Sequence, residues 1–165
     1  MLPLKAGDKL VCMLPMAHMY GLAFEFLYEF SVGCHIYYLT RMPSPKIIFQ
    51  AFADVKPNLI VAVPLIIEKI IKKSVLPKLE TPTMKLLLKV PIINDKIKAT
   101  VREQMIQAFG GNFAAVIVGG AAFNQEVEQF LRMIDFPYTV GYGMTECGPI
   151  ICYDCLLYTS DAADE

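Results

Sequence analysis

Residues 137–149 read PYTVGYGMTECGP, an apolar strand-like run followed by a turn that combines glycines with a ring, a hydroxyl and a carboxylate. The turn is therefore expected at the carboxyl end of a strand, where open α/β sheets bind their ligands. Glycine lets the backbone approach a flat base or a phosphate. The hydroxyl of Thr145 can donate to a phosphate oxygen, whereas Glu146 repels phosphate unless a divalent cation lies between them. This stretch predicts a site for Mg²⁺-ATP.

The rest of the chain alternates strand-like and helix-like segments. Strands are expected at residues 8–13, 34–39, 58–63, 114–118 and 138–142. Helices are expected at 17–30, 46–54, 64–74 and 125–134, and from Asn94 or Asp95 to Phe109, with a short helix or packed loop at 84–90. Ser44 and Asn124 are suited to N-caps, and Gly110-Gly111 to a helix end. Strands joined by helical crossovers indicate an α/β fold, a parallel-rich sheet with helices on both faces.

Two further segments accompany the turn, LPMAHMYGL at residues 14–22 and VGGAA at residues 118–122. In this order the three resemble the Leu-Pro-x-x-His-x-x-Gly, Gly-Gly-Ala and Tyr-Gly-x-Thr-Glu segments of the adenylate-forming (AMP-binding) superfamily. The first segment and the long helical stretch between Ile66 and Phe109 look most like the long-chain fatty acid CoA ligases. The resemblance covers residues 1–154 and implies a partial AMP-binding domain, part of the large N-terminal domain of such an enzyme.

The resemblance also implies a role for each matching residue. The backbone of Gly119, Gly120 and Ala121 would line the adenine and acyl pockets, and His18 with Gly21 would form a wall of the acyl pocket. The ring of Tyr142 would pack on adenine, with Gly143 and Met144 beside the cofactor. Thr145 and Glu146 would be the catalytic residues: Thr145 would orient the α-phosphate, and Glu146 would hold Mg²⁺.

Each residue also has a purely structural interpretation. Tyr142 could be a half-buried tyrosine at a strand end, and the segment at 119–121 could be an ordinary strand-to-helix turn. Thr145 and Glu146 could cap a following helix, since both residue types suit a first turn. His18 could be a hydrogen-bonded core histidine, and His35 belongs to no motif.

The implied reaction has two half-reactions. A fatty acid carboxylate attacks the α-phosphorus of ATP and releases pyrophosphate, and coenzyme A then displaces AMP from the acyl-adenylate. The family's upstream phosphate loop, ribose-binding aspartate, hinge and C-terminal lysine domain have no counterpart in this sequence. We therefore expect the intact parent, and not this chain alone, to be active. A non-catalytic truncated remnant, or a ligase for another carboxylic acid, is the alternative.

The last residues differ in character from the rest. Residues 155–165 read CLLYTSDAADE and continue neither the strand pattern nor the family pattern. We expect a non-native extension there, with an ordinary disordered tail as the alternative.

Composition and charge bear on partners and location. The formal net charge of −1 gives no basic surface for nucleic acid. The best candidate for a membrane span, residues 59–67, is far shorter than the roughly 20 apolar residues that a spanning helix needs, and it contains Pro64. Without a secretory signal at its start, the chain is expected in the cytoplasm, with peripheral membrane contact possible and the oligomeric state open.

The sequence lacks the motifs of other phosphate-binding and hydrolytic enzymes. The chain has no Gly-Lys pair for a P-loop, no third glycine for a G-x-G-x-x-G fingerprint and no G-x-S-x-G elbow. Cys147, Cys152 and Cys155 have a ferredoxin-like spacing, but no fourth cysteine follows. All five cysteines are expected to be reduced and structural.

Overall fold

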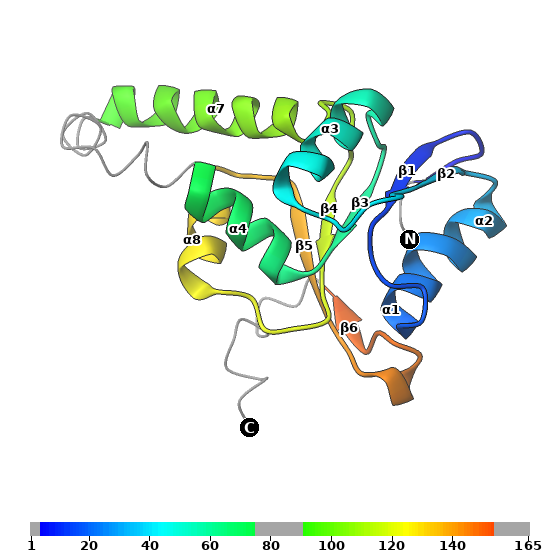
Figure 1. Ribbon diagram of the computed structural model, residues 1–165. Coiled ribbons are helices and arrows are strands. Elements are labelled where there is room, and N and C mark those ends of the chain that lie inside the picture. Colours follow the sequence, from blue (N-terminus) through cyan, green and yellow to red (C-terminus); the bar gives the residue numbers. More distant parts are fainter. Residues whose placement is uncertain (1–3, 75–90, 154–165) are drawn as a thin grey trace.

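Parallel strands form the centre of the computed structural model, which describes residues 4–74 and 91–153 (Figure 1). The strands are β1 (Lys9–Cys12), β2 (His35–Tyr38), β3 (Ile60–Ala62), β4 (Val116–Val118), β5 (Tyr138–Tyr142) and β6 (Cys152–Tyr153). Strand β1 pairs with β2, while the other four follow the order β3-β4-β5-β6. All pairs are parallel except β5 with β6. The α/β class and the parallel pairing predicted from the sequence are confirmed.

Helices connect these strands. The first helical run comprises α1 (Met19–Leu22), a π-helical segment (Ala23–Leu27) and α2 (Tyr28–Val32). The others are α3 (Pro45–Val55), α4 (Pro64–Ser74), α7 (Pro91–Ala108) and α8 (Gln125–Met133). Ser44 and Asn124 cap α3 and α8 as predicted, because their side chains accept from the backbone N–H groups of Ile47 and Val127. None of the helices in the described ranges combines the length and apolar character that crossing a bilayer requires.

Two features of the strands were not predicted. The expected single sheet is divided in two at Asn58, whose side-chain Oδ1 accepts from the N–H of Lys9 at 2.9 Å while its N–H donates to Lys9 O at 2.8 Å. One backbone bond and one side-chain bond thus join the two sheets at this point, where no β1–β3 ladder forms. In addition, β6 returns antiparallel to β5, pairing Tyr142 with Cys152, so the intervening loop folds back on itself.

Two predicted helix starts were wrong. The first helix begins at Met19 instead of residue 17, because His18 is its N-cap. The long helix begins at Pro91 and not after Asn94 or Asp95. Proline suits a first helical position, since its ring fixes a helical φ and its missing N–H would have no partner there. The segments expected at 84–90 and 155–165 lie outside the described residues.

Apolar side chains cover the central strands on both faces. One face, with Ala62 and Val118, packs against α3, α4 and α8 through Phe52, Ile71 and Leu131, all at most 1% exposed. The opposite face packs Val61 and Ile117 of the strands against Leu10, Leu14, Tyr20 and Leu59. Burial on both faces accounts for the continuous apolar runs in the sequence. It also fixes the carboxyl ends of β3, β4 and β5 side by side.

Candidate active-site cleft

Gly119, which follows β4, lies next to Gly141 of β5. Val118 and Val140 are partners in the parallel ladder, so β4 ends at Gly119 beside Gly141, where β5 continues into its pairing with β6. A Cβ built at Gly119 would lie 3.2 Å from the carbonyl oxygen of Gly141 and 3.2 Å from the Tyr20 ring. Gly120 has a φ of +84°, which disfavours any residue with a side chain. The close approach of three segments therefore depends on these glycines.

The loop after β5 is folded into a short turn. Thr145–Cys147 form a single 3-10 turn, and its N-cap, Met144, makes no side-chain capping hydrogen bond. The backbone N–H of Ile151 donates to Tyr142 O at 2.9 Å and closes the loop. Thr145 and Glu146 are exposed on this turn. No longer helix follows them in the described residues, so the alternative that they cap one is not supported.

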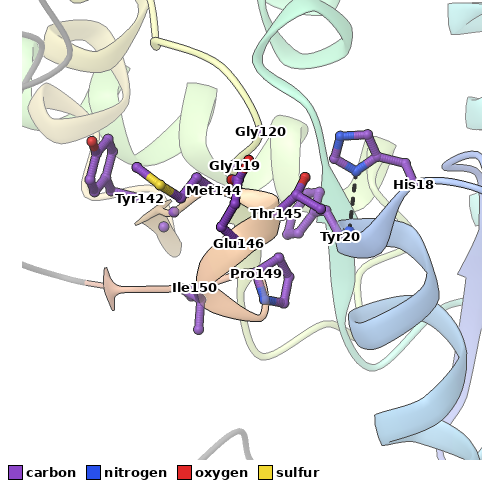
Figure 2. A pocket seen from close by; sticks show the side chains of 12 residues that line it. His18, Tyr20, Gly119, Gly120, Tyr142, Met144, Thr145, Glu146, Pro149 and Ile150 are labelled. Carbon is purple, nitrogen blue, oxygen red and sulfur yellow. Dashed lines mark hydrogen bonds between the residues drawn. The ribbon is translucent and has the colours of Figure 1, made fainter.

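These segments enclose a cavity of about 280 Å³. Its lining comes from the start of α1, the end of β4 and the β5–β6 loop: His18, Tyr20, Gly119, Gly120, Gly141, Tyr142, Gly143, Met144, Thr145, Glu146, Pro149 and Ile150. Figure 2 shows Tyr142 and Met144 on one side and His18 on the other, with Gly119 and Gly120 between them. The structure thus brings together residues of all three sequence motifs. Ala121 is exposed and lies outside this lining.

A second cavity, of about 230 Å³, adjoins the first. It is lined by Leu14, Pro15, His18, Tyr20, Gly21, Val63 and Gly120, most of which present apolar surface. Gly21 packs tightly here, since a Cβ on it would lie 2.7 Å from the carbonyl oxygen of Pro15. Three residues, His18, Tyr20 and Gly120, line both cavities. The first cavity presents polar and apolar surface in similar amounts, whereas the second is almost wholly apolar. We call them the polar and the apolar cavity, and they share a wall.

His18 is exposed and is not a core residue. Its Nδ1 accepts from the backbone N–H of Tyr20 at 3.2 Å, which caps the first helix (Figure 2). An accepting Nδ1 leaves Nε2 as the nitrogen that carries the proton in the neutral ring. His18 therefore positions the start of α1 while its ring faces both cavities.

Tyr20 was not among the residues predicted for the site. It is 8% exposed, and its hydroxyl lies 3.4 Å from both Ala62 O and Ile117 O. Burial, with a contribution from Glu25, raises the pKa of Tyr20 well above its ordinary value, so the hydroxyl stays protonated. The signal in the sequence was an aromatic residue directly before Gly21 in a matched motif.

Glu25 was also missed. It is 2% exposed and accepts hydrogen bonds from the backbone N–H groups of Met13 and Leu14, the latter at 2.7 Å, and from the Cys12 thiol at 3.3 Å. Burial raises the pKa of Glu25 to about 7, although these hydrogen bonds oppose the rise. Glu25 thus holds the end of β1, from which Leu14 enters the apolar cavity.

Glu29 lies one helical turn beyond Glu25 and is fully buried. Neither carboxylate oxygen has a hydrogen-bond partner within the described part of the chain. Burial, with a smaller contribution from Glu25, raises the pKa of Glu29 to about 7. Two glutamates four residues apart in an otherwise apolar helix were the signal in the sequence.

The remaining titratable groups add no metal cluster. No group of three or more His, Cys, Asp or Glu side chains that could hold a metal ion occurs in residues 4–74 and 91–153. Cys12, Cys34, Cys147 and Cys152 are free thiols, and Cys155 lies outside the described residues. Glu146 is therefore a single exposed carboxylate at the mouth of the polar cavity.

Known proteins resemble this chain in sequence. The chain is 26% identical to long-chain-fatty-acid–CoA ligase 4 of Saccharomyces cerevisiae over 152 residues, and 23% identical to ligase 1 of that yeast over 156 residues. Each match covers 84% of this chain and 22% of the relative. The chain thus spans about a fifth of the length of these curated relatives.

Solved structures resemble its fold. The benzoate CoA ligase of Burkholderia xenovorans LB400 matches with a TM-score of 0.60 at 18% identity, over 91% of this chain and 25% of that one. The o-succinylbenzoate coenzyme A synthetase of Bacillus subtilis, in complex with ATP and magnesium, matches with a TM-score of 0.62 at 16% identity, over 92% and 25%. The family model for AMP-binding enzymes matches residues 2–164. The chain belongs to the AMP-binding enzyme family.

Proposed function

We propose that the intact parent of this chain is an ATP-dependent long-chain fatty acid CoA ligase, and that the cleft described above is where the acyl-adenylate forms. The observation that carries this proposal is the wall shared by a polar and an apolar cavity. An acyl-adenylate is divided in the same way: its adenosine and charged phosphate suit the polar cavity, and its acyl chain suits the apolar one. The choice of a long-chain fatty acid as the substrate is supported by the long-chain-fatty-acid–CoA ligases among the relatives of this chain.

The polar cavity supplies the groups that adenylate formation requires. The ring of Tyr142 is half-buried beside Gly143 and offers a flat apolar surface for adenine. Gly119 and Gly120 line this cavity without side chains of their own, and the Cβ position of Gly119 is taken up by Tyr20 and Gly141. Thr145 offers a hydroxyl to the α-phosphate, and Met144 completes this side of the cavity.

Glu146 is suited to a metal that arrives with the nucleotide. Mg²⁺ is commonly held by one or two carboxylates together with substrate phosphates and water. A single exposed carboxylate at the cavity mouth fits that requirement without a preformed cluster of ligands. The bound ion would neutralise phosphate charge, which is much of what catalysis of attack at phosphorus requires.

The proposed reaction has two half-reactions. The acid would lie in the apolar cavity beside Gly21, with its carboxylate at the wall formed by His18. Attack of a carboxylate oxygen on the α-phosphorus breaks the bond to pyrophosphate and leaves the acyl-adenylate. The thiolate of coenzyme A, having lost its proton, then attacks the acyl carbon, and AMP departs with the electron pair. Holding the reactants in place supplies most of the acceleration.

The extent of the domain is part of the proposal. Both cavities are smaller than the roughly 300–1,000 Å³ of typical ligand sites. This size fits a cleft whose other walls come from parts of the parent beyond this chain. We propose residues 1–154 as a partial AMP-binding domain, inactive alone, and residues 155–165 as a tail outside it, although the family match itself continues to residue 164.

Cytoplasmic location with peripheral membrane contact stays a prediction.

Acid-dependent exchange of pyrophosphate into ATP by the intact parent tests this function. We expect exchange with palmitate to exceed exchange with benzoate. Glu146→Ala should lower exchange by about 10² or more, the scale of losing a key charge-stabilising group. Glu126→Ala, which removes an exposed glutamate on α8, is the matched control and should retain exchange. Undiminished exchange in the Glu146 variant would refute its role, and preference for benzoate would refute the acid class.

A further inference from the structure

Tyr20 occupies the junction of the two cavities. Its side chain lines both of them, together with His18 and Gly120. Gly120 contributes no side chain, and His18 is exposed with one nitrogen engaged in capping the helix. Tyr20 is 8% exposed and is the largest buried side chain of the three. It therefore supplies most of the bulk at the boundary between the compartments.

The Tyr20 ring is fixed from several directions. Its hydroxyl reaches the carbonyl oxygens of Ala62 at the end of β3 and Ile117 in β4, both at 3.4 Å, so one proton is shared between two acceptors. Phe24 meets the ring edge-on, with centroids 5.7 Å apart. On the other side Gly119 approaches so closely that a Cβ there would lie 3.2 Å from the ring and hydroxyl. A ring held in this way cannot swing aside for a wider ligand without breaking these contacts.

We propose that Tyr20 determines which acids react, because it limits the width of the cleft beside the reacting carboxyl group. This inference rests on the proposed function, which places the carboxylate at the wall shared by the cavities. A straight chain presents only CH₂ groups next to its carboxyl and passes the Tyr20 ring. An acid with a methyl branch on the carbon next to the carboxyl is wider at that point and is excluded.

The test compares two acids in the same enzyme. In the intact parent, kcat/KM is measured for a straight-chain acid and for its 2-methyl derivative, and the ratio of the two values is the selectivity. Tyr20→Ala and Tyr20→Leu should lower this ratio by about tenfold or more. An enzyme pocket typically discriminates by this factor between substrates that differ by one methylene. Tyr20→Phe keeps the ring and should keep the ratio. Because both acids meet the same variant, a general loss of stability does not change the ratio.

A matched control separates the effect of cleft width on selectivity from the effect of disturbed helix packing. Phe26 lies on the same helical run, stacks on Phe30 and lines neither cavity. Phe26→Leu should leave the ratio unchanged.

Each outcome decides the matter. Unchanged selectivity in an active Tyr20→Ala or Tyr20→Leu variant overturns the inference and leaves the proposed function standing. A wild-type parent that uses the 2-methyl acid as readily as the straight acid also overturns it, without need of any variant. A wild-type parent that activates neither acid overturns the proposed function and this inference with it.

Discussion

Replacing Glu29 by Met should make the chain more stable at alkaline pH. Glu29 is fully buried with no partner for its carboxylate in the described residues, and burial raises its pKa from 4.5 to about 7. Between these values the folded protein holds a proton that the unfolded chain releases, so stability falls as pH rises through this window. At about 1.36 kcal/mol per pH unit, the full loss is about 3 kcal/mol, of which about 2.5 kcal/mol falls between pH 5 and pH 8.

Methionine suits the site because it is unbranched, similar in length and tolerant of irregular apolar surroundings. The variant lacks the ionisable group, so its stability relative to the wild type should increase by about 2.5 kcal/mol between pH 5 and pH 8. Glu25 has a pKa raised in the same direction, but it is present in both proteins and largely cancels in the comparison.

Urea unfolding of the 165-residue chain, followed by circular dichroism at several pH values, measures this difference. The chain has no tryptophan, so its fluorescence is a weaker probe. Glu103→Met, at an exposed position on α7, is the control and should show the wild-type dependence on pH. Stability curves of the wild type and the Glu29→Met variant that stay parallel from pH 5 to pH 8 would refute the reasoning.

Three further predictions concern the turn, a cap and the core. Gly143→Ala should abolish pyrophosphate exchange in the parent, since its Cβ would overlap the Pro149 carbonyl oxygen and lie 2.8 Å from the Ile150 Cα; unimpaired exchange would show that the turn adapts. Asn124→Ala removes the N-cap of α8 and should lower the free energy of unfolding by about 1 kcal/mol in urea titrations, whereas no change would mean that the cap contributes nothing. Leu131→Ala, at a fully buried position, should cost about 2–5 kcal/mol in the same assay, and a cost under about 1 kcal/mol would argue against this core.

The position of the Tyr142 turn at the carboxyl end of a strand could be predicted from simple rules. Apolar runs at 58–63 and 114–118 indicated strands buried on both faces, and their carboxyl ends had to meet at one edge of a parallel sheet. Glycines at those ends then mark where a ligand can approach the backbone. In the structure Gly119 and Gly120 line the cavity, but the Cβ positions of Gly119 and Gly143 are occupied by neighbouring segments of the chain, so the approach of a ligand there stays a prediction.

What the sequence did not predict depends on contacts between distant segments. Glu25 is held by N–H groups of Met13 and Leu14, and no local pattern reveals that a helical carboxylate will reach a strand end. At the break between the two sheets, the side chain of Asn58 accepts from the distant N–H of Lys9. Strand β6 has only two residues, too few to show a sequence periodicity. It is a strand because it pairs with β5.

The most direct test of the central claim is the structure of the intact parent bound to a non-hydrolysable analogue of a long-chain acyl-adenylate. We expect adenine against Tyr142, the phosphate mimic beside Thr145, and the acyl chain passing Tyr20 into the cavity lined by Leu14 and Val63. Binding of the analogue at another place, or an acyl chain that leaves by another route, would contradict it.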